Sequence, residues 1–118
     1  VYFKDYVNPT SQAPRSYSGQ EYGLEVYRFF GGTAPPPQNS WDKEEVYVRR
    51  DTAGEITTII ICANNPNFAV NFCRQKFYMF INFMKAFLDV SYPHAYLPEW
   101  QIIEQHTITI LNGFALIH

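Results

Sequence analysis

Residues that could carry out catalysis are few in this chain, and they are scattered along it. None of the three histidines, His94, His106 and His118, has another histidine, a cysteine or an acid four residues away, so zinc-type ligand spacing is absent. Neither a glycine-rich phosphate loop nor a Gly-x-Ser-x-Gly nucleophile elbow occurs. A nucleophile pair of Cys73 and His94 is conceivable, but a cysteine held in a disulfide is a poor nucleophile. We therefore expect no enzyme, no metal and no cofactor.

Acidic residues are the other candidates for catalysis, because a pair of carboxylates could hydrolyse a glycosidic bond. Eight of the eleven acids lie before residue 56. Those at positions 42, 44 and 45 precede a predicted strand and are typical of a solvated face. Only Asp89, Glu99 and Glu104 follow. We prefer a binding function to this glycosidase interpretation.

Charge and hydropathy exclude two classes of partner. The 9 basic and 11 acidic residues leave a net charge of −2, and the basic residues are not clustered, so nucleic-acid binding is not indicated. The longest mostly apolar run, residues 77–87, is interrupted by Asn82 and Lys85 and is too short to span a bilayer. The chain begins at Val1 without a leader pattern, and we interpret it as a mature or trimmed form.

The two cysteines indicate the compartment. Cys62 ends the β-branched run 56–62, Cys73 opens a second apolar stretch, and the asparagine- and proline-rich residues 64–67 between them predict a turn. Two strands that fold back over this turn could bring the cysteines within the distance that a disulfide needs. The alternative is a pair of reduced, buried thiols. We favour the disulfide, and with it an oxidising compartment.

One segment has the character of a binding surface. Residues 92–100 contain two prolines, which stiffen the segment and reduce the entropy lost on binding, together with an acid and several aromatic side chains. Tyrosine and tryptophan are favoured as interface anchors. For Trp100 we prefer packing in the core. For Glu99 and Tyr96 two interpretations stay open: contact with a partner, or a structural role, in which Glu99 serves as an acid at a helix N-terminus.

Hydrophobic periodicity predicts one domain, residues 1–118, of the α+β class: a mainly antiparallel sheet packed with one C-terminal helix, with a nearly all-β fold as the alternative. Residues 1–22 are expected to be a partly irregular arm, and residues 31–40 a proline-rich loop. A helix should begin near Pro98 and end near Gly113, with Gln101, Glu104 and Gln105 facing water. The predicted strands are residues 23–30, 45–50, 55–62, 72–80 and 86–92. Residues 76–89 also fit helical spacing, so a helix there remains the competing interpretation.

A family resemblance is carried by the C-terminal half. The pattern consists of Cys62, residues 73–77, residues 88–92, the run Leu97-Pro98-Glu99-Trp100 with the three residues after it, and a final Phe114. It resembles small periplasmic lipoproteins of Gram-negative bacteria, and among them the immunity lipoproteins that neutralise a muramidase effector of the type VI secretion system.

The resemblance implies a periplasmic inhibitor whose partner is a cognate secreted muramidase, an enzyme that cleaves the glycan backbone of peptidoglycan. Glu99 would enter the active-site groove of that enzyme, and loops such as residues 31–41 would form the rim. Such proteins are tethered to a membrane through a lipidated N-terminal cysteine, which is not present in this chain. The further partner-binding residues are then Tyr96, Leu97, His94, Tyr92 and Trp41.

Overall fold

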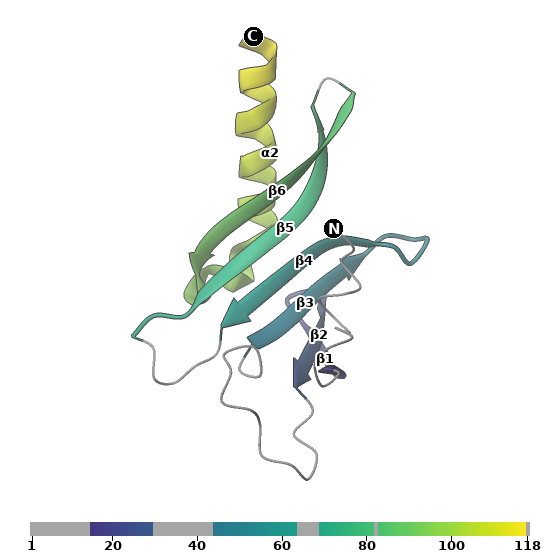
Figure 1. The fold of residues 1–118 in the computed structure, drawn as a ribbon, viewed down its shortest axis with the longest axis vertical. Coiled ribbons are helices and arrows are strands. Elements are labelled where there is room, and N and C mark those ends of the chain that lie inside the picture. The colour runs from purple at the N-terminus through teal and green to yellow at the C-terminus, as the bar shows by residue number, and fades with distance from the viewer. Residues whose placement is uncertain (1–14, 30–43, 64–68, 82, 118) are drawn as a thin grey trace.

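A computed structural model of the chain describes residues 15–29, 44–63, 69–81 and 83–117, which form one antiparallel sheet and two helical segments (Figure 1). The sheet has six strands in the order β1-β2-β3-β4-β5-β6, so that each strand pairs with the next one along the chain. The strands are β1 (Arg15–Glu21), β2 (Leu24–Phe29), β3 (Glu44–Arg50), β4 (Ile56–Ala63), β5 (Phe72–Ile81) and β6 (Met84–Pro93).

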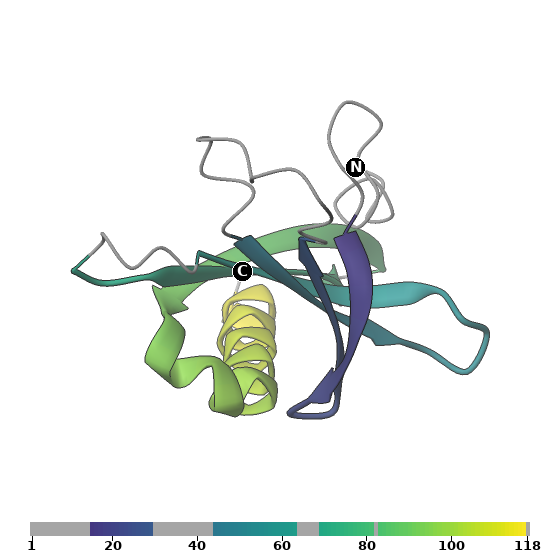
Figure 2. The same cartoon turned by 90° about the horizontal axis from the view of Figure 1, so that it is seen from below.

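The helical part follows the last strand and covers one face of the sheet. A 3₁₀-helix, η2 (His94–Glu99), leads directly into the α-helix α2 (Trp100–Ile117). Figure 2 shows α2 lying against one side of the strands, where it packs mainly on β5. The predicted α+β class is confirmed, and the nearly all-β alternative is wrong. No helix in the described part of the chain is long and apolar enough to cross a membrane.

The competing helix over residues 76–89 is wrong, because these residues form the β5–β6 hairpin. Ile81 pairs with Met84 at the turn, and the ladder continues without a register shift to the pair of Phe72 and Pro93. Apolar side chains occur on both faces of this hairpin, since Phe77 is buried on the helix side and Tyr78 packs on the opposite side. A segment that is apolar on both faces satisfies helical spacing by coincidence.

The predicted irregular N-terminal arm is wrong for its last residues, because β1 pairs with β2. This strand was not predicted because its residues include no β-branched side chain and contain a glycine, which is depleted in strands. The rings of Tyr17 and Tyr27 lie 5.7 Å apart across the pair, and a bulge falls between Tyr17 and Gly19. At the turn, Tyr22 and Gly23 both have positive φ angles. Residues 1–14 and the predicted loop 31–40 lie outside the described residues.

Strand alternation divides the buried apolar side chains between the two faces of the sheet. The face opposite α2 buries Val46, Val48 and Ile59, against which partly buried residues such as Tyr78 pack. The face toward α2 holds the larger cluster, which also joins the helical segments to the sheet. Its members are Leu24, Val26, Tyr47, Ile60, Cys62, Cys73, Tyr92, Leu97 and Trp100.

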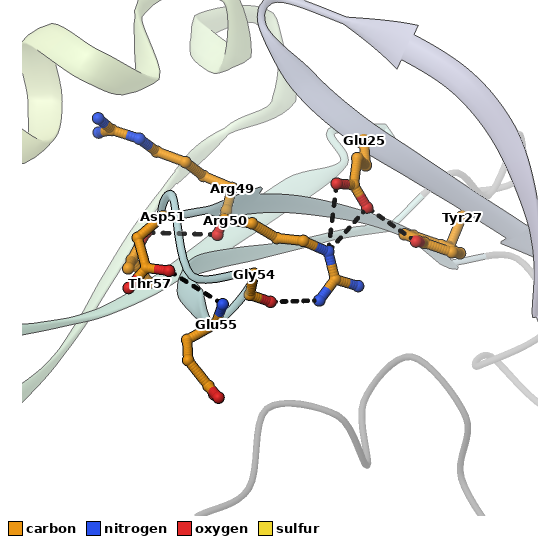
Figure 3. A network of polar contacts seen from close by, with 8 residues as sticks. All are labelled: Glu25, Tyr27, Arg49, Arg50, Asp51, Gly54, Glu55 and Thr57. Carbon is orange, nitrogen blue, oxygen red and sulfur yellow. Dashed lines mark hydrogen bonds and ion pairs between the residues drawn. The ribbon is translucent and has the colours of Figure 1, made fainter.

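The β3–β4 turn is fastened by polar contacts that explain its charged residues (Figure 3). Arg50 donates to Glu25 at 3.1 Å and to the carbonyl of Gly54 at 3.0 Å, and the Tyr27 hydroxyl donates to Glu25 at 2.8 Å. The carboxylate of Asp51 accepts from two backbone N–H groups of the turn. The hairpin predicted here is confirmed, and its charged residues stabilise the turn.

Candidate partner-binding site

The Cys62–Cys73 disulfide is present, and it lies directly beneath the segment that follows β6. The two cysteines are paired on neighbouring strands, with a Cα–Cα distance of 4.0 Å, and both are fully buried. The predicted disulfide is confirmed, and the alternative of two free thiols is wrong. A ring nitrogen of His94 lies within 4.8 Å of both sulfur atoms. Because the sulfurs are bonded to each other, this group contains neither a thiolate nucleophile nor thiolate ligands.

The candidate site is η2, which is held against the sheet by buried side chains at its C-terminal end. Leu97 is 1% exposed and Trp100 is 2% exposed, and both belong to the large core cluster. At the other end of η2, the His94 N–H donates to the carbonyl of Asn71 at 2.8 Å. Pro98 lies inside η2 rather than in the first turn of α2. The segment is therefore fixed at both ends.

A buried polar network also fixes the start of α2. The side-chain amide of Gln75, on β5, donates to the carbonyl of Trp100 at 3.1 Å, and its oxygen accepts from the Tyr92 hydroxyl at 2.7 Å. The indole N–H of Trp100 donates to the carbonyl of Tyr22 at 2.8 Å. Buried polar groups are costly unless they are hydrogen-bonded, so each of these bonds helps to specify one position for the helix.

Glu104 belongs to this network, so the expectation that it faces water is wrong. Its carboxylate is buried and accepts from the Thr58 hydroxyl at 2.7 Å, with Arg49 at 3.9 Å. Glu104 lies four residues after Trp100 and so shares its helix face. Burial, together with the charge of Glu104, raises the pKa of Tyr92. The available signal was Thr58 and Gln75, polar residues on the strand face that otherwise holds Ile60, Cys62, Cys73 and Phe77.

The outer side of η2 presents one aromatic and one acidic side chain. Tyr96 is 52% exposed, and Glu99 is exposed immediately before the first residue of α2. Within the described part of the chain, neither makes a side-chain hydrogen bond or an ion pair. The N-terminus of a helix carries a partial positive charge, so the structural interpretation of Glu99 keeps its physical basis beside the partner-contact interpretation.

A shallow pocket lies beside η2 at the same end of the molecule. It has a volume of about 260 Å³ and lies between the residues that precede β5 and the start of η2. His94 is half-buried in its wall. The other lining residues are Ala69, Val70, Asn71, Pro93 and Ala95.

The predicted partner-binding residues thus divide into three groups. Glu99, Tyr96 and His94 reach the surface of one segment. Leu97 and Tyr92 are core residues, at 1% and 8% exposure, so they support η2 from beneath instead of forming its outer surface. Trp41 lies outside the described residues. Trp100 packs in the core, as preferred from the sequence.

A second exposed apolar region lies at the turn of the β5–β6 hairpin, and it was not predicted from the sequence. Phe80 is 66% exposed, Phe83 is 101% exposed and Met84 is 73% exposed. Phe83 also has a φ angle of 66°, which is unusual for a bulky residue. The available signal was a pair of apolar residues next to the asparagine of the turn.

Comparisons with known proteins give one informative match. No family model matches the chain, and no curated protein does. Among solved structures, the chain is similar to an immunity protein of the Stenotrophomonas maltophilia type IV secretion system, with 20% sequence identity and a TM-score of 0.62. The match covers 81% of this chain and 50% of that one, so this chain spans about half the length of its structural neighbour. At this identity the likeness establishes a shared fold.

Proposed function

We propose that this protein is an immunity protein that binds a cognate secreted effector and inhibits it. Two independent likenesses support this proposal: the fold shared with an immunity protein and the sequence pattern of the C-terminal half. The observation that supports it most directly is the way in which η2 exposes side chains on an anchored backbone. This segment exposes Glu99 and Tyr96 on a backbone that is anchored by Leu97 and Trp100.

The proposed target is a cell-wall muramidase, and this part of the proposal comes from the sequence resemblance. The resemblance indicates a type VI secretion system, whereas the structural neighbour belongs to a type IV system. Both point to immunity against a secreted effector. The active-site groove of a muramidase contains a catalytic carboxylic acid and further hydrogen-bonding groups for the sugar chain. A carboxylate inserted there would accept hydrogen bonds that normally serve the substrate.

Rigidity is what makes this segment suited to such a groove. A segment that is already ordered before binding loses little conformational entropy on association, and both ends of η2 are fixed by contacts to the sheet. Tyr96 adds a large side chain with few torsions, which is typical of interface anchors. A carboxylate desolvated in a groove requires hydrogen-bond donors from the partner, so the Glu99 contact would contribute specificity as well as affinity.

The proposed compartment is the periplasm, where peptidoglycan and its hydrolases meet. A disulfide between buried cysteines agrees with an oxidising compartment. Attachment to a membrane through a lipidated N-terminal cysteine remains part of the proposal that rests on the resemblance alone.

The proposal is tested by mixing the purified protein with a candidate secreted muramidase and following the clearing of a peptidoglycan suspension. We expect inhibition that saturates near equimolar protein, and co-elution of the two proteins on size exclusion. Co-elution with undiminished hydrolysis would instead support an envelope binding or assembly module. Absence of both would contradict an immunity function toward that enzyme.

A further inference from the structure

The two edges of the sheet differ in how they are protected from pairing with another strand. The edge strand β1 is seven residues long and contains a bulge next to Gly19, a feature that disfavours further pairing. The other edge strand, β6, is ten residues long and pairs with β5 along its whole length without a register shift. A long regular edge offers a row of backbone donors and acceptors to a further strand.

The hairpin turn determines which residues of β6 direct their backbone groups outward. Only two residues separate the paired Ile81 and Met84, and in such a hairpin this pair is hydrogen-bonded across the turn. Backbone direction then alternates along β6. Residues at odd positions therefore point their N–H and C=O groups away from β5. These residues are Lys85, Phe87, Asp89 and Ser91.

We propose that β6 pairs antiparallel with β6 of a second copy, around a two-fold axis at Phe87. This register places Lys85 of each copy opposite Asp89 of the other, once on each side of the axis. An axis at Asp89 would oppose two carboxylates, and an axis at Lys85 would oppose two ammonium groups, both of which are unfavourable. The register at Phe87 is therefore selected by charge complementarity, and a two-fold axis forms a closed dimer.

The charged side chains on this edge are able to form the ion pairs that this register requires. Arg74 and Lys76 both contact Oδ2 of Asp89, at 2.7 and 3.0 Å, and Oδ1 makes no hydrogen bond within the described part of the chain. The Nζ atom of Lys85 lies 4.2 Å from the centroid of the Tyr78 ring, and Lys85 forms no ion pair with a described acid. Phe87 is 38% exposed at the proposed axis, where the two rings would meet.

A cross-linking experiment tests the register directly, because both native cysteines are held in the disulfide and a new cysteine would be the single free thiol. In the proposed dimer the two Cα atoms at position 87 lie about 5.5 Å apart, within disulfide reach. Those at position 91 lie about 26 Å apart. Under mild oxidation we expect Phe87→Cys to form a covalent dimer and Ser91→Cys, at a position that is also exposed on this edge, to remain uncross-linked.

Light scattering on the unmodified protein provides the second measurement. We expect a concentration-dependent mass that rises from 13.8 kDa toward twice that value. Lys85→Glu should raise the dimer dissociation constant about tenfold, because like charges then oppose each other on both sides of the axis. A monomer at all concentrations would overturn the proposal, as would equal cross-linking at positions 87 and 91. Protection of β6 amides by the effector alone would assign this edge to the effector instead.

Discussion

The two ends of the β5–β6 hairpin both expose aromatic side chains, but the contacts that support them differ. At the η2 end, Tyr96 lies beside Leu97 and close to Trp100, which are both buried. The disulfide joins β4 to β5 beneath this segment. At the turn end, Phe80 and Phe83 are more exposed, and they are carried by a two-stranded hairpin.

Exposure alone is therefore a weak guide to a binding site. Isolated exposed apolar residues are normal on soluble proteins, and their number says little about function. Support from beneath is more informative, because preorganisation reduces the entropic cost of binding. By that criterion η2 is the stronger candidate for the proposed effector contact, although the turn end exposes more apolar side chains. Four substitutions test this comparison.

The largest effect is expected from Trp100→Ala, which removes the main anchor of η2. Truncation of a fully buried tryptophan should lower the free energy of unfolding by about 3–5 kcal/mol, and it also leaves the carbonyl of Tyr22 without its donor. Denaturant titration measures this loss. Ile102→Ala is a suitable control, since Ile102 is 55% exposed on the same helix. Equal losses for the two variants would mean that η2 is not anchored as described.

Removal of the disulfide should have the next largest effect. The double variant Cys62→Ala/Cys73→Ala opens a loop with a sequence separation of 11, which corresponds to about 2–3 kcal/mol of unfolding free energy in the chain-entropy model. Hydrogen exchange should also become faster in residues 69–73 and in η2, while the β5–β6 turn keeps its rate. A uniform change along the hairpin would remove the distinction between its two ends.

The ion pairs midway along the hairpin predict a pH-dependent effect. Burial opposes ionisation of Asp89, but hydrogen bonds from Arg74 and Lys76 outweigh it and lower the pKa of the carboxyl group. A lowered folded-state pKa contributes stability above the unfolded-state value of about 3.9, and this contribution is lost as the pH falls through the folded-state pKa. Asp89→Asn should therefore cost about 0.5–1 kcal/mol at pH 7. The unfolding free energies of the unmodified protein and the variant, measured over a range of pH, should become equal in acid. A difference that does not change with pH would contradict this assignment.

An effect of similar size but opposite sign is expected at the turn end. Phe83 has a φ angle of 66° and is fully exposed, so its side chain contributes strain without packing. Phe83→Gly should raise the free energy of unfolding by about 0.5–1 kcal/mol. Phe83→Ala keeps the unfavourable backbone preference and should change little. Destabilisation by the glycine variant would show that the Phe83 ring makes a contact that its exposure does not reveal.

Much of the sheet could be predicted because its signals are local. β-Branched runs, alternating apolar residues and the predicted turn at residues 64–67, which lies outside the described residues, were sufficient for β2 to β6 and for the disulfide. β1 was missed because its pairing depends on a neighbouring strand and not on its own composition. Glu104 was misplaced because its burial depends on Thr58 and Gln75, which are distant in the sequence and donate to its carboxylate.

The candidate site remains a prediction as a segment, and the structure shows which of its side chains face inward. The two prolines and the mixture of acid and aromatics identified residues 92–100, which form the end of β6, η2 and the start of α2. The side chains that face inward could not be distinguished from those that face outward, because a 3₁₀-helix has no periodic pattern long enough to read. Leu97 and Tyr96 were therefore both predicted to contact the partner, although only Tyr96 is exposed.

Inhibition of a candidate muramidase effector by the Glu99→Ala variant tests the central claim most directly. The matched control is Glu55→Ala, which removes an exposed acid from the β3–β4 turn. We expect the Glu99 variant to need at least about 100-fold more protein for half-inhibition, as for a desolvated charged contact worth some 2–5 kcal/mol, with an unchanged melting temperature, and the Glu55 variant to inhibit normally. Equal inhibition by both variants, or a melting temperature lowered only in the Glu99 variant, would contradict the account and assign Glu99 to the helix terminus.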